Sequence, residues 1–96
     1  MLYLILLSYV RPLAEIDEHL EGHRAFLNKH YDAGHFLMSG PKQPRSGGVI
    51  LASAGSEEEV SQWLAEDPFI QSGVASCEIV CWQPTKAAAG WPLEKE

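Results

Sequence analysis

Three histidines share one side of a stretch with helical periodicity, and imidazole is the side chain that most readily moves a proton near neutral pH. On a helical wheel, His19, His23 and His30 lie within about 40° of one another, at the border of an apolar arc. A solvated helix face more often carries Lys or Glu at such positions. Three roles are open for His23: a buried histidine bonded to a carbonyl, a metal ligand, or a general acid or base.

The metal alternative depends on the i, i+4 spacing of His19 and His23, which can place two imidazoles on one ion. The pattern lacks the Glu of a His-Glu-x-x-His motif, and no further ligand is close in sequence, so we predict no metal site. Gly47-Gly48 lacks the residues of a phosphate loop, and no dinucleotide fingerprint is present, so no cofactor is predicted. His30 lies one turn before the expected helix end, where its predicted role is structural.

Asp67 directly precedes Pro68, and this pair is typical of the cap of a short helical turn. Asp67 can also take part in chemistry. In the topology expected below, the end of the second helix can lie beside the first. A carboxylate bonded to one ring nitrogen of His23 would fix its tautomer and make the other nitrogen more basic.

The hydroxyl and thiol side chains give weaker signals. Ser39 is outside any Gly-x-Ser-x-Gly elbow, so a turn hydroxyl is expected and a hydrolase nucleophile is not. Cys77 and Cys81 are four residues apart in an expected strand, roughly 13 Å along one face, which is too far for a disulfide between them. We expect both to be small buried apolar residues.

Periodicity and breakers place the elements that must hold these side chains. Strands are expected at 2–10, 35–39, 49–54 and 74–82. A long helix is expected at 13–33, with Gly34 as its left-handed exit. A second helix begins after a capping box at Ser56–Glu59 and ends at Asp67-Pro68, with one further turn over 68–72. The order β-α-β-β-α-β predicts an α+β, ferredoxin-like fold, with a four-stranded antiparallel sheet and two helices on one face.

Both faces of the first strand are apolar or aromatic, although the helices can cover only one. The other face, judged from Tyr3, Leu7, Val80 and Trp82 or their neighbours of opposite parity, is too apolar to face water. We therefore predict a homodimer in which two sheets pack face to face.

Composition limits the classes of partner. The 96 residues suit one domain, predicted over 1–84, with a C-terminal tail at 85–96 in which Trp91 could anchor to a neighbour. The net charge is −6 and the basic residues are scattered, so neither nucleic acid nor an anionic membrane is an expected partner. The apolar run 2–7 is too short to span a bilayer and does not resemble a signal peptide. Without a disulfide framework, a cytoplasmic location is predicted.

Several short motifs in order resemble the YciI-like (YCII-related) family over roughly 1–84. They are His23-Arg24-Ala25-Phe26-Leu27, 34–41, Gly47-Gly48, Asp67-Pro68-Phe69 and Gly73. The resemblance implies a ferredoxin-like fold, usually assembled as a dimeric α/β barrel, with an active site around a histidine and an aspartate.

By the resemblance, these two residues fall on His23 and Asp67, and the family's corner falls on Ser39, Gly40 and Pro41. We expect those three, with His19 and Phe69, to bind substrate. Aromatic walls are expected from Phe26, Trp63 or Phe69.

One relative in the family removes chloride from a chlorinated hydroxyhydroquinone, and related muconolactone isomerases move protons on small lactones. The expected function is therefore a cofactor-independent enzyme that uses His/Asp acid–base chemistry for elimination, isomerisation or dehydration of a small cyclic or enolisable compound. One alternative is a non-catalytic small-molecule-binding or accessory protein. A further alternative is a haem- or metal-binding protein of the α/β-barrel superfamily.

Overall fold

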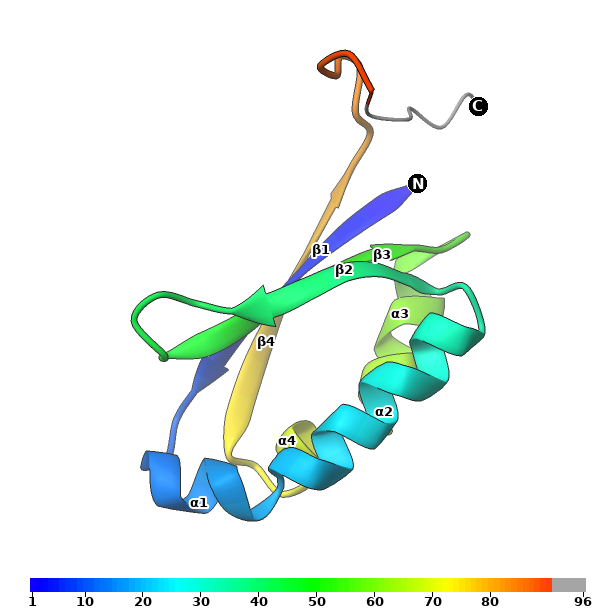
Figure 1. The fold of residues 1–96 in the computed structure, drawn as a ribbon. Coiled ribbons are helices and arrows are strands. Elements are labelled where there is room, and N and C mark those ends of the chain that lie inside the picture. The colour runs from blue at the N-terminus through cyan, green and yellow to red at the C-terminus, as the bar shows by residue number, and fades with distance from the viewer. Residues whose placement is uncertain (91–96) are drawn as a thin grey trace.

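The protein is built on one four-stranded antiparallel sheet, seen here in a computed structural model that describes residues 1–90 (Figure 1). The strands are β1 (Leu2–Tyr9), β2 (Phe36–Pro41), β3 (Gly47–Ser53) and β4 (Ala75–Trp82). Their order is β2-β3-β1-β4, so β1 is central and pairs with β3 on one side and β4 on the other.

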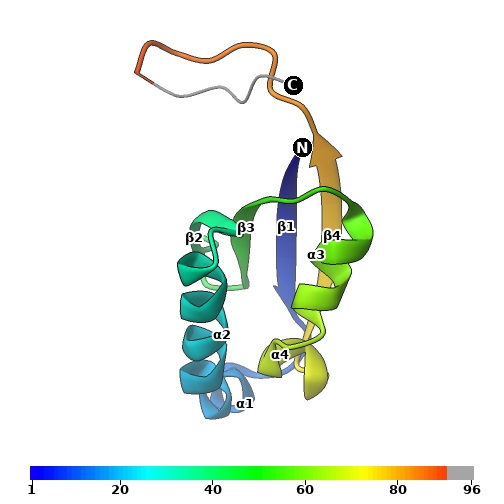
Figure 2. The ribbon, with the colours of Figure 1, turned by 90° about the vertical axis from the view of Figure 1, so that its right-hand side faces the viewer.

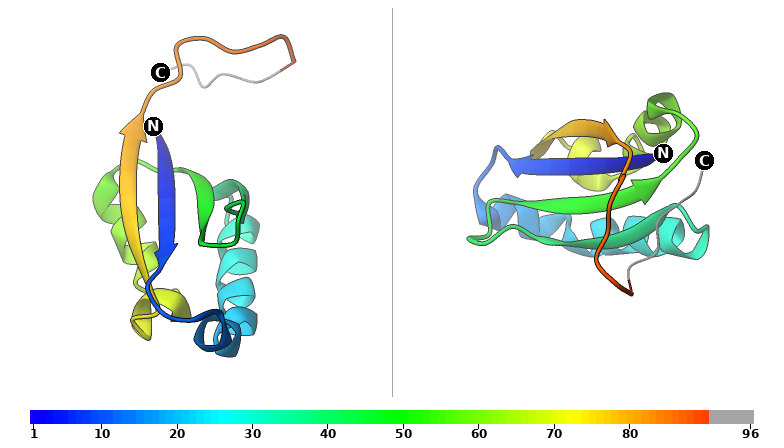
Figure 3. Two further views of the ribbon diagram at one scale, coloured as in Figure 1. Left: turned by 90° about the vertical axis from the view of Figure 1, so that its left-hand side faces the viewer. Right: turned by 90° about the horizontal axis from the view of Figure 1, so that it is seen from above.

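The helices lie together on one face of this sheet (Figures 2 and 3). Helices α1 (Leu13–Glu18) and α2 (Leu20–Asp32) connect β1 to β2, and helices α3 (Glu57–Leu64) and α4 (Pro68–Gln71) connect β3 to β4. The order of elements is therefore β-α-β-β-α-β, and the predicted ferredoxin-like fold is confirmed.

The long helix predicted over 13–33 is interrupted, which the sequence did not indicate. His19 leaves helical geometry, with φ −109° and ψ 4°, so that α1 and α2 meet at an angle (Figure 1). The predicted exit is confirmed, because Gly34 has φ +79°. The serine half of the predicted capping box forms, since Glu59 N–H donates to Ser56 Oγ at 3.2 Å. The Glu59 carboxylate reaches back one residue further than a capping box requires and accepts from Gly55 N–H at 3.3 Å.

The register decides which residues each face carries. Tyr3 and Leu7 lie under the helices and are 3% and 1% exposed, so it is their neighbours of opposite parity that face away. On that uncovered face Leu4 lies between Leu51 and Val80. Val80 is 37% exposed, and the face is apolar as predicted.

Cys77 and Cys81 are paired opposite Leu7 and Tyr3 and so belong to the helix-covered side, yet both are exposed. The prediction that they are buried was wrong. Their strand β4 is an edge strand of the sheet, so its outer flank has no neighbouring strand.

Two groups of buried side chains hold the helices on the sheet. The larger lies between the sheet and helices α2 and α3, and consists of Tyr3, Ile5, Leu7, Phe26, Phe36, Ile50, Ala52, Val60 and Leu64. The smaller joins α1 and α4 to the start of β4, and consists of Ile16, Phe69, Val74 and Ala75. Beyond β4 the described chain runs away from the sheet without helix or strand up to residue 90 (Figure 1). Trp91 lies outside the described residues.

Gly22 marks the close approach of α2 to α4. A Cβ built at this position would lie 3.0 Å from Pro68 Cγ. Ordinary side-chain contacts are longer, so a side chain at this position would require Pro68 to move by a few tenths of an ångström. The glycine therefore suits the observed spacing between the two helices.

We expect Gly22→Ala to bring no gain in the free energy of unfolding, although alanine in an open helix interior is worth about 1 kcal/mol over glycine. The added methyl group must push Pro68 away, and this offsets the gain in helix propensity. Urea denaturation of Gly22→Ala beside Asn28→Ala, at an exposed position of the same helix, measures the difference. A gain of about 1 kcal/mol for Gly22→Ala would contradict the contact.

Candidate functional site

The imidazole of His23 and the carboxylate of Asp67 meet between α2 and the start of α4. His23 Nδ1 lies 2.9 Å from Asp67 Oδ1, and the side chains are 12% and 0% exposed. A carboxylate oxygen only accepts hydrogen bonds, so Nδ1 carries the proton and donates it. The other ring nitrogen, Nε2, has no bonding partner among the described residues and is free to act on a ligand.

Phe69 fixes the plane of this imidazole. Its ring stacks on His23 with centroids 4.0 Å apart and an interplanar angle of 7°. Its backbone N–H donates to Asp67 Oδ1 at 3.0 Å, so Asp67 is also the N-cap of α4. The capping role and the bond to His23 therefore coexist on one oxygen.

The second oxygen, Asp67 Oδ2, is buried and has no hydrogen-bond partner among residues 1–90. A carboxylate removed from water is costly unless donors compensate it. Here the compensation comes from His23 and the Phe69 N–H, both on Oδ1. Loss of the imidazole would leave this carboxylate poorly satisfied, so the pair holds α2 and α4 together.

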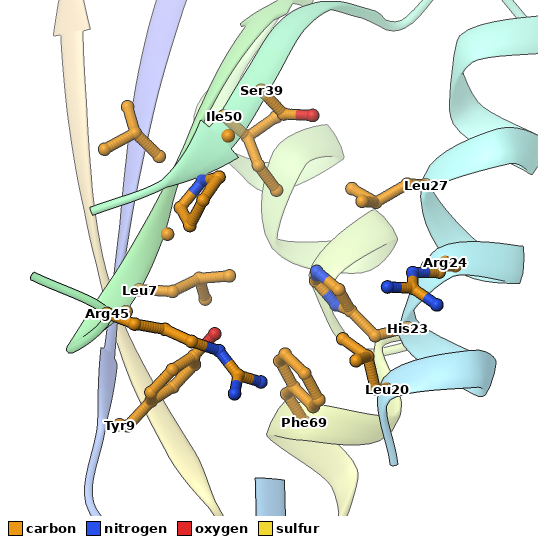
Figure 4. A pocket seen from close by; sticks show the side chains of 15 residues that line it. Leu7, Tyr9, Leu20, His23, Arg24, Leu27, Ser39, Arg45, Ile50 and Phe69 are labelled. Atoms are coloured by element: carbon orange, nitrogen blue, oxygen red, sulfur yellow. The ribbon is translucent and has the colours of Figure 1, made fainter. Parts of the chain in front are cut away.

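His23 lines a cavity of about 430 Å³ between the sheet and helix α2 (Figure 4). Its wall is formed by Leu7, Tyr9, Leu20, His23, Arg24, Leu27, Ser39, Gly40, Pro41, Arg45, Gly47, Gly48, Val49, Ile50 and Phe69.

Of the residues predicted to bind substrate, Ser39, Gly40, Pro41 and Phe69 thus surround the same space as His23. The fifth, His19, lies at the interruption between α1 and α2 and is not among the lining residues.

The cavity is open partly because glycines occupy the strand beneath it. Gly48 is paired with Leu7 and so belongs to the helix-covered side of β3, where any other residue would direct a side chain toward α2. At Gly47 a Cβ would collide with the carbonyl of Leu7, so this position excludes side chains altogether. Gly48 therefore leaves space opposite His23, whereas Gly47 is required by the close approach of the Leu7 carbonyl.

Two arginines in the wall were missed by the sequence analysis. Arg45, in the loop between β2 and β3, bonds Asp17 Oδ1 of α1 through Nη2 at 2.6 Å, and its guanidinium carbon lies 5.9 Å from the centre of the Tyr9 ring. The bond to Asp17 raises the pKa of Arg45, which stays cationic. Arg24 follows His23 on α2, so its place next to the predicted base could have indicated that it lines the site. The position of Arg45 in a loop gave no such signal.

A second histidine cluster lies at the other end of α2. His30 is 2% exposed, and its Nδ1 lies 2.9 Å from His35 Nδ1 while its Nε2 lies 2.9 Å from Glu66 Oε1. The His35 ring stacks on Trp63 at 3.9 Å. Trp63 thus packs on this cluster, and neither it nor Phe26 lines the cavity. The role of His30 is structural, as predicted, but it comes from burial and hydrogen bonds to His35 and Glu66 and not from an interaction with the helix end.

Among residues 1–90, no group of three or more His, Cys, Asp or Glu side chains is arranged to hold a metal ion. None of the described helices combines the length and the apolar character needed to cross a membrane.

We expect Glu66 to stabilise the fold in a pH-dependent way. Hydrogen bonds from Lys29 and then from His30 lower the pKa of its carboxyl below the ordinary value. A lowered pKa contributes stability above the unfolded-state pKa, and this stability is lost as the pH falls through the folded-state pKa. The difference in free energy of unfolding between the wild type and Glu66→Gln should therefore shrink on acidification from neutral pH to below about 4. A constant difference would contradict the ion pair, and Glu18→Gln, which removes a carboxylate outside any such contact, is the control.

Comparison with known proteins places this chain in a family. The YCII-related domain matches residues 1–83 of the chain. The uncharacterized protein YjpA of Bacillus subtilis (strain 168) is 29% identical over 85 residues, which is 88% of this chain and 100% of that protein.

A structure of the 5-chloro-2-hydroxyhydroquinone dehydrochlorinase TftG from Burkholderia phenoliruptrix AC1100, in complex with 2,5-dihydroxybenzoquinone, is similar in fold. Its TM-score is 0.75 at 23% identity, covering 86% of this chain and 94% of TftG. The sequence motifs, the fold and the family match agree, and this chain belongs to the YCII-related domain family.

Proposed function

We propose that this chain is a cofactor-independent enzyme that moves a proton on a small cyclic or enolisable compound, with His23 as general base and acid. The observation that carries the proposal is the 2.9 Å bond from His23 Nδ1 to the buried Asp67, which leaves Nε2 as the nitrogen available to a ligand in the cavity. Asp67 is the partner that orients the imidazole and stabilises its protonated form.

The proposed step begins when Nε2 takes a proton from an acidic C–H or O–H of the bound compound. In an elimination, the electron pair left behind forms a double bond to the neighbouring carbon while the bond from that carbon to an anionic leaving group breaks. In an isomerisation, the pair delocalises into the adjoining π system and the imidazolium returns the proton to another carbon. In both cases His23 ends the cycle neutral, after it has given its proton to product or solvent.

The comparison with TftG supports this reaction class. The activity of TftG, the removal of hydrogen chloride from a hydroxylated ring, is an elimination on a small cyclic compound, and TftG binds a ring of this kind, dihydroxybenzoquinone. For the present chain we propose that Ser39, Gly40, Pro41 and Phe69 contact the substrate.

We predict that His23→Gln lowers turnover by about 10²- to 10⁴-fold, the usual contribution of a positioned general base. The assay follows chloride release from 5-chloro-2-hydroxyhydroquinone and solvent-deuterium incorporation into a panel of enolisable cyclic compounds by NMR. His19→Gln is the matched control: it removes an imidazole from outside the cavity wall, so its activity should stay within a few-fold of wild type.

Full activity in a folded His23→Gln protein would remove the assignment of the base. A comparable loss in His19→Gln would instead bring His19 into the substrate site. A metabolite that survives purification in the cavity, from which no product forms, would favour the non-catalytic binding protein.

We further propose that the chain forms a homodimer through the uncovered face of the sheet. The centre of this face is the row Leu51–Leu4–Val80, one residue from each of three neighbouring strands. Met38, paired with Leu51 on β2, and Trp82 extend the apolar surface and are 53% and 42% exposed. Apolar patches of this kind typically mark association.

The cytoplasmic location remains a prediction.

We expect Val80→Glu to convert the dimer to a monomer, because a carboxylate at the centre of two packed sheets would be buried without a partner. Sedimentation equilibrium gives the mass directly. Leu13→Glu adds the same charge at an exposed apolar position on α1 and should leave the dimer intact. A monomeric wild type, or a dimeric Val80→Glu protein, would refute this interface.

A further inference from the structure

We propose that the cavity takes an anionic ring compound, with a carboxylate or an ionised hydroxyl held by Arg24 and Arg45. This inference rests on the proposed function and names the class of substrate that the His23 site accepts. It concerns two residues to which the sequence motifs assigned no role.

The charges in the cavity wall have one sign. Arg24 and Arg45 line it, and no Asp or Glu is among the described residues that do so. This is notable in a chain with 13 acidic and only 7 basic residues and a net charge of −6. Asp67 is fully buried behind the imidazole, and its charge is directed at His23. Asp17 pairs with Arg45 through one nitrogen, so the attraction for an anion comes from Arg24 and from the guanidinium donors of Arg45 that Asp17 does not engage.

Arg45 still has donors to offer a ligand. A guanidinium carries five N–H groups in a planar fork, and Asp17 engages Arg45 through Nη2 alone. Figure 4 shows the side chain reaching from its loop past Tyr9 toward Phe69. The contact with Asp17 holds the guanidinium in place, which lowers the entropy cost of binding a second acceptor.

Arg24 has no hydrogen bond or ion pair with any residue in 1–90, although the other guanidinium of the wall is paired. It follows His23 directly on α2 and is exposed, and Figure 4 shows its guanidinium beside this helix while His23 extends toward the middle of the cavity. An arginine without a partner beside the proposed base is suited to bind the charged oxygen of a ligand.

The remaining wall suits a planar apolar ring. Leu20, Leu27 and Val49 supply aliphatic surface, and Phe69 supplies an aromatic one. The volume of about 430 Å³ is within the range of about 300 to 1,000 Å³ typical of small-molecule sites. A ring on these walls, with its anionic oxygen on the arginines, lies in the same space as His23 Nε2.

The experiment measures binding of three monocyclic probes to the wild-type chain by amide chemical shifts: benzoate, 4-nitrophenolate and the neutral benzamide. We expect at least one anion to bind in the cavity and benzamide to bind about tenfold or more weakly, the difference expected for a charged hydrogen bond. Benzoate and 4-nitrophenolate separate a carboxylate from an ionised hydroxyl as the preferred group.

Arg24→Gln and Arg45→Gln should each weaken binding of the preferred anion by about tenfold. Arg11→Gln is the matched control, because it makes the same change in net charge at an exposed arginine that pairs with Glu15 outside the cavity wall. Arg45→Gln also removes the ion pair with Asp17, and the loop could rearrange as a result. Arg45→Lys controls for this because it keeps the positive charge; it should bind the anion with intermediate affinity, since lysine lacks the planar fork.

Three results would overturn the inference: benzamide binding as tightly as both anions, no anion binding at millimolar concentration, or an equal loss of affinity in Arg11→Gln. The proposed function fails separately. Turnover that survives His23→Gln would refute His23 as the base and leave the anion site unaffected. Equal binding of charged and neutral probes would refute the anion site and leave the proposed proton transfer unaffected.

Discussion

The structure depends on one buried carboxylate. Asp67 is removed from water completely and receives its hydrogen bonds from the Phe69 amide and the His23 imidazole. Since an uncompensated charge in this position would be costly, the start of α4 must stay against α2. Gly22, which leaves room for Pro68, lets the two helices approach closely enough for that bond.

The cap of a short helix and the orientation of the proposed catalytic imidazole are here the same interaction. Asp67 Oδ1 caps the N-terminus of α4 by accepting the Phe69 N–H, and it fixes the tautomer of His23. The side chain of Phe69 stacks on the imidazole ring. A single three-residue segment thus sets the position, plane and protonation of the proposed base. Helix α4 is held in place because Phe69 packs with Ile16 in the smaller cluster of buried side chains.

Helix α2 carries two histidines in similar positions on its wheel with different surroundings. His23 meets Asp67 and the open cavity above Gly48, whereas His30 meets His35 and Glu66 and is packed among aromatic rings. The helix alone does not distinguish them. The difference comes from the strand beneath, which lacks side chains under His23, and from the loops that supply the partners.

Much of the fold could be predicted from local chemistry. Gly34, the Ser56–Glu59 box and Asp67-Pro68 act through neighbouring backbone groups, and strand alternation predicted a sheet with an apolar uncovered face. The interruption at His19 and the exposure of Cys77 could not be read in this way, because they depend on how distant elements pack.

The sequence by itself determined the order of elements, the caps and the residue types available for proton transfer, because hydrogen bonds within a few residues and the periods of helix and strand are local properties. Only the tertiary structure decided that His23 meets Asp67, that His19 is left out of the cavity wall, and that Arg24 and Arg45 share one space. These arrangements bring together residues 21 to 44 positions apart, so they follow from the packing of whole helices on the sheet.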